Sequence, residues 1–161
     1  MRIGFGYDVH PLAPGRKLVL GGVELAYERG LAGHSDADVL IHAIIDALLG
    51  ATALGDIGAH FPPSDPAYKD ISSIVLLQRV AEILRNRGWH VGNIDATVVA
   101  QQPQLAPFIG DMRQRISAAL DIDVGRVSVK ATTSEGLGFA GREEGMVAYA
   151  VAVVEGGDED D

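Results

Sequence analysis

The chain has 161 residues, of which 47% are hydrophobic, enough for one domain with a hydrophobic core. No apolar run approaches the ~18 residues of a membrane span, and 13 basic against 22 acidic side chains, a net charge of −9, argue against a nucleic-acid-binding surface. Cysteine is absent, which excludes disulfides and thiolate metal sites, so a bound metal must be held by His, Asp or Glu.

Hydrophobic periodicity and turn residues predict a series of strands and helices. In chain order these are a strand at 2–10, two short strands at 17–20 and 23–27 around Gly21-Gly22, a polar loop at 28–36, a helix at 37–53, a proline-rich loop at 54–70, a helix from Ser72 or Ser73 to Arg87, a strand at 91–100, a loop at 101–107, a helix from Pro107 to Leu120, a strand at 126–131, a glycine-rich loop at 132–145 and a final strand at 146–154. This order predicts an α+β fold, a mixed β-sheet with helices packed on one face.

The final strand, 146–154, is apolar on both of its faces. A one-domain monomer cannot easily bury both faces, so we expect the sheet to self-associate in a closed assembly. We assign residues 1–155 to a single domain and residues 156–161, which end in a run of acids, to a disordered acidic tail. Residues 1–6 show no signal or transit peptide pattern.

The most informative motif begins in the first strand, where Asp8 and His10 stand two residues apart and so point to the same face. A helix packed over that face can bring His42 to the same place, and three such ligands with one open position describe a catalytic zinc site. Alternatively, Asp8 is a turn residue, His10 a surface residue and His42 a helix histidine with satisfied hydrogen bonds. Asp46, one helical turn beyond His42, either orients that imidazole or is solvated.

Two early loops carry polar groups that suit a ligand, each with a plain structural alternative. His34 and Ser35 precede the long helix, so they either begin that helix or donate hydrogen bonds to an anionic or hydroxylated substrate. Asp56 lies between Gly55 and Gly58, where it either belongs to a tight turn or accepts hydrogen bonds from ligand hydroxyls.

Two later loops have the same ambiguity. Thr132 and Thr133, with exposed backbone N–H groups, suit a phosphate, and Glu135 suits a hard cation such as Mg²⁺ or Mn²⁺; the alternative is an ordinary glycine-rich connection. Residues 100–105 either present backbone groups to the edge of a base or simply connect a strand to a helix.

Four stretches are distinctive in combination: Gly-Tyr-Asp-Val-His, Gly-His-Ser-Asp-Ala-Asp-Val followed by His42, Ala-Leu-Gly-Asp-Ile-Gly, and Lys-Ala-Thr-Thr-Ser-Glu-Gly-Leu-Gly-Phe-Ala-Gly-Arg-Glu-Glu-Gly. Taken in this order, they resemble the family of 2-C-methyl-D-erythritol 2,4-cyclodiphosphate synthases of the non-mevalonate isoprenoid pathway, over residues 1–154. The resemblance implies a cyclising phosphorus–oxygen lyase. Such an enzyme converts 4-diphosphocytidyl-2-C-methyl-D-erythritol 2-phosphate to the cyclic diphosphate with release of CMP, by metal-assisted intramolecular phosphoryl transfer.

The resemblance also implies roles for the matching positions. Zinc would be held by Asp8, His10 and His42, and a second divalent cation, Mg²⁺ or Mn²⁺, by Glu135. His34, as a charge stabiliser, and Thr133 would be catalytic. The implied substrate contacts are Asp8, His10, His34, Ser35, Asp56, Ile57, Gly58, Phe61, Asp65, Ala100, Pro103, Leu105, Ala106, Thr132, Thr133, Glu135, Phe139 and Arg142.

The family is a homotrimer with active sites between adjacent subunits, and we expect a cytoplasmic enzyme with no nucleic-acid or membrane partner. Two positions depart from the family pattern: Gln104 stands where the nucleotide loop commonly has Lys, and Pro63 where Asp is frequent. Two other functions remain open. One is a zinc-dependent phosphohydrolase of a nucleotide-linked substrate, and the other is a trimeric nucleotide- or isoprenoid-binding protein with a structural metal.

Overall fold

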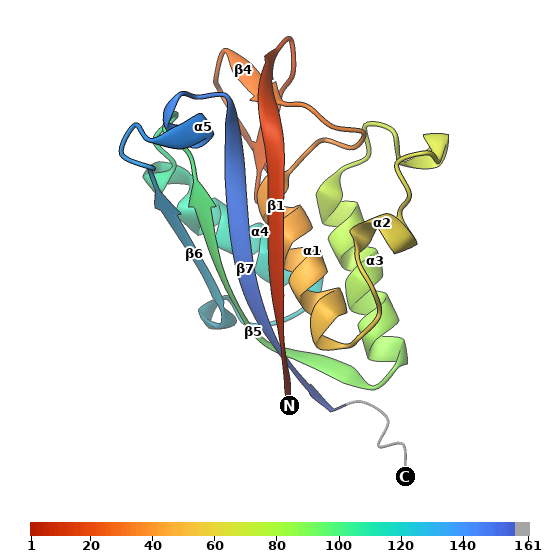
Figure 1. The fold of residues 1–161 in the computed structure, drawn as a ribbon. Helices are drawn as coiled ribbons and strands as arrows, with labels where there is room; N and C mark the ends of the chain where they lie inside the picture. The colour runs from red at the N-terminus through yellow and green to blue at the C-terminus, as the bar shows by residue number, and fades with distance from the viewer. Residues whose placement is uncertain (157–161) are drawn as a thin grey trace.

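The computed structural model describes residues 1–156 as a five-stranded mixed sheet covered by helices, with a separate two-stranded hairpin (Figure 1). The strands are β1 (Arg2–Pro14), β2 (Leu18–Leu20), β3 (Val23–Leu25), β4 (Arg29–Leu31), β5 (Trp89–Val99), β6 (Val127–Thr132) and β7 (Gly145–Gly156). The helices are α1 (Val39–Ala51), α2 (Ile57–His60), α3 (Ser73–Asn86), α4 (Ile109–Leu120) and α5 (Gly138–Gly141), with 3₁₀ turns η1 (Pro66–Tyr68), η2 (Ala106–Phe108) and η3 (Val124–Arg126).

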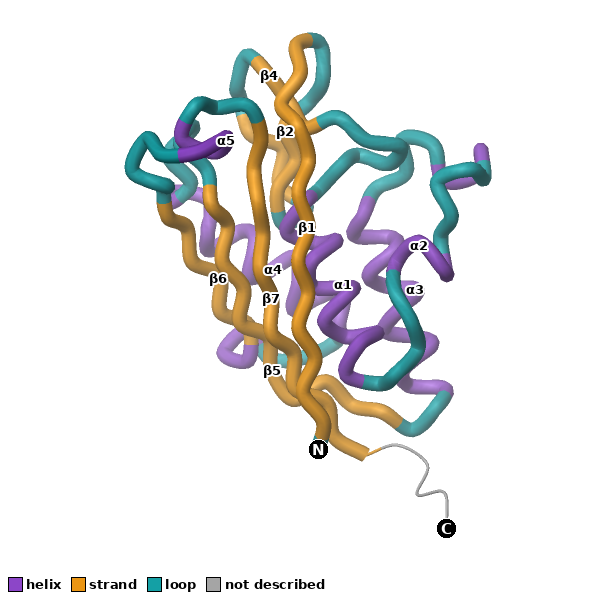
Figure 2. The backbone as a smooth tube through the Cα atoms, viewed as in Figure 1, coloured by secondary structure: helices purple, strands orange, loops and turns teal. Residues whose placement is uncertain are grey.

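The sheet has the strand order β4-β1-β7-β5-β6, in which only β5 and β6 are parallel. Figure 2 shows the long helices α1, α3 and α4 on one side of this sheet. The predicted α+β architecture, a mixed sheet with helices on one face, is confirmed. Within residues 1–156, no helix is both long and apolar enough to cross a membrane.

The close packing of β1 on α1 depends on two glycines. A methyl group added at Gly4 would overlap the carbonyl oxygen of Ala47, and one added at Gly6 would overlap that of Ala43. The backbones of the strand and the helix therefore lie in direct contact. Because side chains alternate along a strand, Asp8 continues the face of β1 that carries Gly4 and Gly6, and it points toward α1.

The start of α1 is fixed by Asp38, a fully buried N-cap residue. Its carboxylate accepts hydrogen bonds from the backbone N–H groups of Ile41 at 3.1 Å, Gly21 at 3.0 Å and Gly22 at 2.7 Å. Burial, with the nearby charge of Asp36, raises the pKa of Asp38 to about 7, although the three N–H donors oppose this shift. The same contacts attach the β2–β3 hairpin to the beginning of the helix.

Several predicted loops contain short elements that the sequence pattern did not indicate. β4 lies in the predicted loop 28–36, α2 and η1 in 54–70, and α5 in 132–145. Each spans only three or four residues, which is too short to show a helical or strand period.

Some predicted boundaries were also wrong. β1 continues past residue 10 to Pro14, because its end pairs with β4. Pro107 lies in η2, and α4 begins two residues later at Ile109. Gly156, which we assigned to the acidic tail, is the last residue of β7; the rest of that tail, 157–161, lies outside the described residues.

The face of the sheet opposite the helices exposes large apolar side chains. We call this set the apolar face: Ile3, Phe5, Tyr7, Val9, Tyr149 and Val151, which are 40% to 67% exposed. The Tyr149 ring lies 6.4 Å from the Phe5 ring and 5.4 Å from the Tyr7 ring, measured between centroids. The predicted apolar outer surface of the final strand is thus present, and β1 extends it.

Candidate functional site

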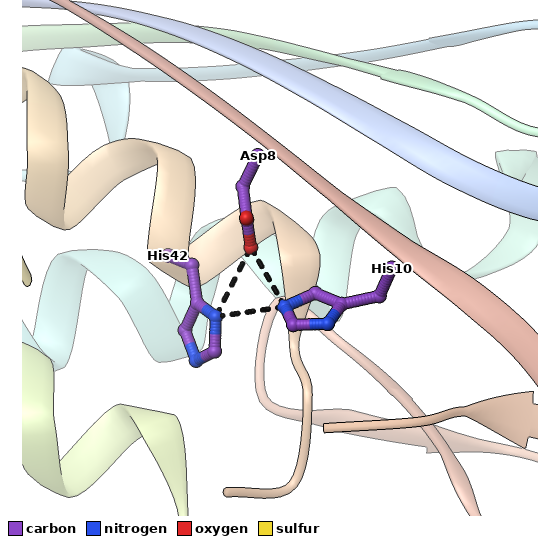
Figure 3. A group of neighbouring side chains, drawn as sticks. All are labelled: Asp8, His10 and His42. Carbon is purple, nitrogen blue, oxygen red and sulfur yellow. Dashed lines mark hydrogen bonds and ion pairs between the residues drawn. The ribbon is translucent and has the colours of Figure 1, made fainter. Parts of the chain in front are cut away.

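Three side chains from β1 and α1 converge at one point (Figure 3). Asp8 Oδ2 lies 2.9 Å from His10 Nε2 and 3.1 Å from His42 Nδ1, and these two nitrogens are 3.2 Å apart. Among residues 1–156 this is the one group of three or more His, Cys, Asp or Glu side chains close enough to share an ion. A carboxylate oxygen and two imidazole nitrogens are typical ligands of a divalent metal ion, so the residues fit such an ion.

The charges of the triad favour a cation. Burial alone would raise the pKa of Asp8, but the hydrogen bonds and charges of His10 and His42 outweigh it and lower this pKa to about 2. Burial alone would lower the pKa of His10, but Asp8 raises it overall, helped by the Ala32 carbonyl and the charge of Asp38. Asp8 is therefore ionised at neutral pH and attracts either a proton on His10 or a metal ion.

Each histidine of the triad uses its second ring nitrogen in a further hydrogen bond. His10 Nδ1 lies 3.0 Å from the carbonyl oxygen of Ala32. His42 Nε2 lies 2.8 Å from the hydroxyl of Ser73 and 3.1 Å from that of Ser35. These contacts direct His10 Nε2 and His42 Nδ1 toward Asp8 (Figure 3).

From the sequence, Asp46 either orients His42 or is solvated. It does not orient His42, so the first of these two interpretations was wrong. Its carboxylate accepts a hydrogen bond from the Ile57 N–H at 2.8 Å and holds the start of α2. The partner of His42 is instead Ser73, which sequence reasoning treated only as a residue at the start of a helix. No local signal links Ser73 to His42, because the two are 31 residues apart.

A cleft of about 230 Å³ opens at the triad and contains most of the predicted residues of the metal side. Its walls are Asp8, His10, His34, Ser35, His42, Ile57, Gly58, Phe61, Pro63, Tyr68 and Leu76. Pro63, which stands where the family often has Asp, lines this cleft, and Tyr68 and Leu76 are wall residues that the sequence did not indicate. We call it the metal cleft.

Two predicted contact residues lie beside the metal cleft rather than in its wall. Asp56 is the N-cap of α2, and its carboxylate accepts from the Ala59 N–H at 2.9 Å. Asp65 caps η1 through the Ala67 N–H, and its carbonyl oxygen lies 2.9 Å from His34 Nε2. That carbonyl therefore holds the His34 ring in place at the wall of the cleft.

A second cleft of about 230 Å³ lies where the parallel strands β5 and β6 end. Its walls are Ala100, Gln101, Pro103, Gln104, Leu105, Ala106, Ala131, Thr132 and Thr133. All six residues that we predicted for the nucleotide side of the site in this region are among them, and Gln104 lies in the wall where the family commonly has Lys. We call it the strand-end cleft.

Besides Asp56 and Asp65, three predicted residues line neither cleft. Glu135 is exposed, and its backbone N–H donates to the Thr133 hydroxyl at 3.2 Å. Phe139 is 39% exposed at the short helix α5. Arg142 forms an exposed ion pair with Glu144, with 3.1 Å between Nη2 and Oε2. Within the described residues, Glu135 belongs to no group of three or more His, Cys, Asp or Glu side chains close enough to share an ion.

The two clefts share no residue and lie on different parts of the sheet. Asp8 of β1 is opposite Ala148 of β7, which in turn is opposite Val98 of β5, so a whole strand separates the two sides. Figure 1 shows β1 beside α1, with β5 and β6 on the other side of β7. One chain thus presents two separate clefts rather than one continuous cleft.

Comparison with known proteins gives a consistent result. A model of the YgbB family matches residues 1–155. The proteins named 2-C-methyl-D-erythritol 2,4-cyclodiphosphate synthase from Syntrophomonas wolfei and Moorella thermoacetica are 64% and 62% identical to this chain; each alignment covers 96% of it, and 99% and 94% of the respective relative. The CDP complex of IspF from Plasmodium falciparum superposes with a TM-score of 0.85 at 31% identity, covering 98% of this chain and 97% of that one.

Proposed function

The chain belongs to the YgbB family and is an enzyme that forms 2-C-methyl-D-erythritol 2,4-cyclodiphosphate in isoprenoid biosynthesis, and from this premise we propose which residues and metals carry out the reaction. The substrate is 4-diphosphocytidyl-2-C-methyl-D-erythritol 2-phosphate, and CMP is released. The observation that carries the assignment of the site is the Asp8–His10–His42 triad at the mouth of a cleft.

The metal at the triad is zinc. Two imidazole nitrogens and one carboxylate oxygen, with no cysteine in the chain, suit zinc in a site that keeps one position for substrate. A second divalent cation, Mg²⁺ or Mn²⁺, is held by Glu135, since a carboxylate is a hard ligand that suits a cation also bound by phosphate oxygens.

The metal cleft and the strand-end cleft act as two half-sites, which take the two ends of the substrate. The metal cleft receives the methylerythritol phosphate part, where His34, Ser35 and the start of α2 can contact its phosphate and hydroxyls. The strand-end cleft receives the cytidine nucleotide, because loop backbone groups and the Thr132 and Thr133 hydroxyls line it. The remaining predicted contacts, Asp56, Asp65, Phe139 and Arg142, reach the substrate from outside the two cleft walls.

The reaction needs no nucleophile from the protein, because both reacting groups are on one molecule. An oxygen of the 2-phosphate attacks the β-phosphorus, the bond from that phosphorus to the α–β bridging oxygen breaks, and CMP leaves with the bridging oxygen. The bound metals supply charge withdrawal from the phosphate oxygens. The Thr133 hydroxyl donates a hydrogen bond to the charge that develops, and His34 acts beside it as a charge stabiliser. The two cleft walls hold the ends of the substrate within reach of each other.

A complete site requires a second subunit. The two half-sites are separated within one chain, and the apolar face leaves six large side chains exposed. A closed homotrimer buries such a face and places the metal cleft of one subunit against the strand-end cleft of the next. Residues 1–155 act as one catalytic domain, and the absence of cysteine suits a cytoplasmic enzyme.

Phosphorus NMR of the purified protein with its substrate and Mg²⁺ tests the proposal. We expect a cyclic diphosphate and CMP, with activity lost on chelation and restored by zinc. A linear or inorganic phosphate product would instead favour a zinc phosphohydrolase, and CDP binding without turnover would favour a non-catalytic binding protein.

A further inference from the structure

The outer side of His42 carries a buried hydrogen-bonded chain that the reaction scheme does not use. Ser73 is fully buried, and its hydroxyl oxygen lies 2.8 Å from His42 Nε2, the ring nitrogen that faces away from Asp8. The same hydroxyl also contacts a carboxylate oxygen of Asp36. His42 is thus connected through one serine to a carboxylate outside the triad.

The direction of these hydrogen bonds follows from the donors available. An ionised carboxylate only accepts, so the single hydroxyl proton of Ser73 is donated to Asp36. The Asp36 carboxylate is fixed in place, because it also accepts from the backbone N–H of Ser73 at 3.0 Å and of Asp38 at 3.1 Å. The Ser73 oxygen is then left to accept, and the proton it accepts is the one on His42 Nε2.

A neutral imidazole carries one N–H, so a proton held on Nε2 leaves Nδ1 with a free lone pair. In His42, Nδ1 is the nitrogen that faces Asp8 and His10. Without a metal ion, the Asp8 carboxylate 3.1 Å away competes for a proton on this nitrogen, and a metal ion would take the place of that proton. We propose that Ser73, held by Asp36, is a positioning residue that fixes the tautomer and the ring orientation of His42 for metal binding. This inference rests on the metal site of the proposed function.

The comparison with His10 supports this role. The second nitrogen of His10 contacts a backbone carbonyl, that of Ala32, which is a permanent acceptor. The second nitrogen of His42, Nε2, contacts a serine hydroxyl instead of a carbonyl. A serine hydroxyl is an equally fixed acceptor only when its own proton is donated to another group, here the carboxylate of Asp36. Ser35, 3.1 Å from His42 Nε2, has no carboxylate contact and instead accepts from the Ala37 N–H at 3.2 Å, so it is the secondary partner.

The test compares Ser73→Ala with Ser72→Ala. Ser72 is the adjacent residue, is exposed and makes no side-chain capping bond, so it is a matched control. Zinc affinity is measured by competition with a chromophoric chelator, and the His42 tautomer by the ¹⁵N shifts of its ring in metal-free protein. We expect Ser73→Ala to weaken zinc binding by about 10- to 100-fold and to mix the two tautomers, whereas Ser72→Ala leaves both unchanged.

Two further variants keep the result interpretable if Ser73→Ala folds poorly. Ser73→Thr retains the hydroxyl and should show the zinc affinity and His42 tautomer of the unmodified protein. Asp36→Asn replaces the carboxylate with a neutral acceptor and should lower zinc affinity by less than Ser73→Ala does. Unchanged affinity and tautomer in Ser73→Ala, or an equal loss in Ser72→Ala, would overturn the inference while the metal site stands. Failure of the unmodified protein to bind zinc would overturn both the inference and the zinc site of the proposed function.

Discussion

Asp8 and His10 set each other's protonation, and this determines when the triad can accept a metal ion. The pKa of Asp8 is lowered to about 2, so this carboxylate stays ionised over the working pH range. The pKa of His10 is raised, mainly by Asp8 against the effect of burial, so its proton competes with the metal up to a higher pH than for an ordinary histidine.

We therefore expect zinc affinity to fall about tenfold for each pH unit below the His10 pKa and to become constant above it. Chelator competition at a series of pH values between about 5.5 and 8 measures this dependence. In metal-free protein, Asp8→Asn removes the partner that raises the His10 pKa, so an NMR titration of the imidazole should show a lower value. An affinity that does not change with pH in this interval would contradict the assignment.

His34 is separable from the triad, which allows its role to be tested alone. It lines the metal cleft but is held by the carbonyl of Asp65 rather than by a triad residue. His34→Ala should lower kcat by about 100-fold, the typical cost of removing one group that stabilises developing charge, while zinc content stays the same. Unchanged turnover would exclude the proposed charge-stabilising role.

The sequence could indicate the triad because its pattern is local on each element. The spacing of Asp8 and His10 directs both side chains to one face of a strand, and His42 lies in a strongly helical stretch. Ser73 and its bond to His42 could not be predicted in this way, because the pairing depends on how α3 packs beside α1. Asp46 shows the opposite error: helical spacing suggested a contact with His42, but the Asp46 carboxylate binds the N–H of Ile57 at the start of α2 instead.

At the level of elements, the contact between β1 and α1 is the part of the fold that positions the triad. Gly6→Ala places a methyl group against the Ala43 carbonyl of α1. We expect the free energy of unfolding to fall by about 3 kcal/mol or more, because backbone atoms cannot move aside as a flexible side chain would. Zinc affinity should fall as well, since β1 and α1 carry different ligands.

Gly110→Ala is the matched control for this substitution. Gly110 is exposed in α4, and an added methyl group meets no atom within 4 Å. It should be stabilising by up to about 1 kcal/mol, since alanine is the better helix former. Denaturant unfolding measures the free energy of unfolding of both variants. Similar changes for the two substitutions would show that the contact between Gly6 and α1 does not contribute to stability.

The long elements were predictable because each contains several periods of its own pattern. Residues 37–53 repeat an apolar stripe over three turns, and 146–154 is an unbroken apolar run. β4 was not predictable, because three residues hold no period and its strand geometry depends on pairing with the end of β1. That end, with Pro11 and Pro14, reads as a strand terminus in isolation.

At the scale of the whole molecule, the proposed assembly has a definite interface: the apolar face is where we expect a partner copy to bind. The Tyr149 ring of this face lies close to the rings of both Phe5 and Tyr7. Sedimentation of the unmodified protein should give the mass of a trimer, and Tyr149→Glu should give monomers that retain the zinc triad but have lost turnover. Val75→Glu is the control, because it adds the same charge at an exposed apolar position on α3, and this variant should stay trimeric. A Tyr149→Glu protein that is trimeric and fully active would contradict the proposed interface.

The separation of the two half-sites within one chain predicts more than the mass of the assembly. It also predicts that each active site combines residues from two subunits. His42→Ala removes the metal half-site and Thr133→Val the nucleotide half-site, so each homotrimer should be inactive. In a mixed trimer, one interface pairs the intact metal cleft of a Thr133→Val subunit with the intact strand-end cleft of a His42→Ala subunit. Equal mixing after subunit exchange should then restore about a quarter of the wild-type activity, given random assembly of closed trimers. Two half-sites that acted within the same chain would restore none, because every chain in the mixture lacks one of them.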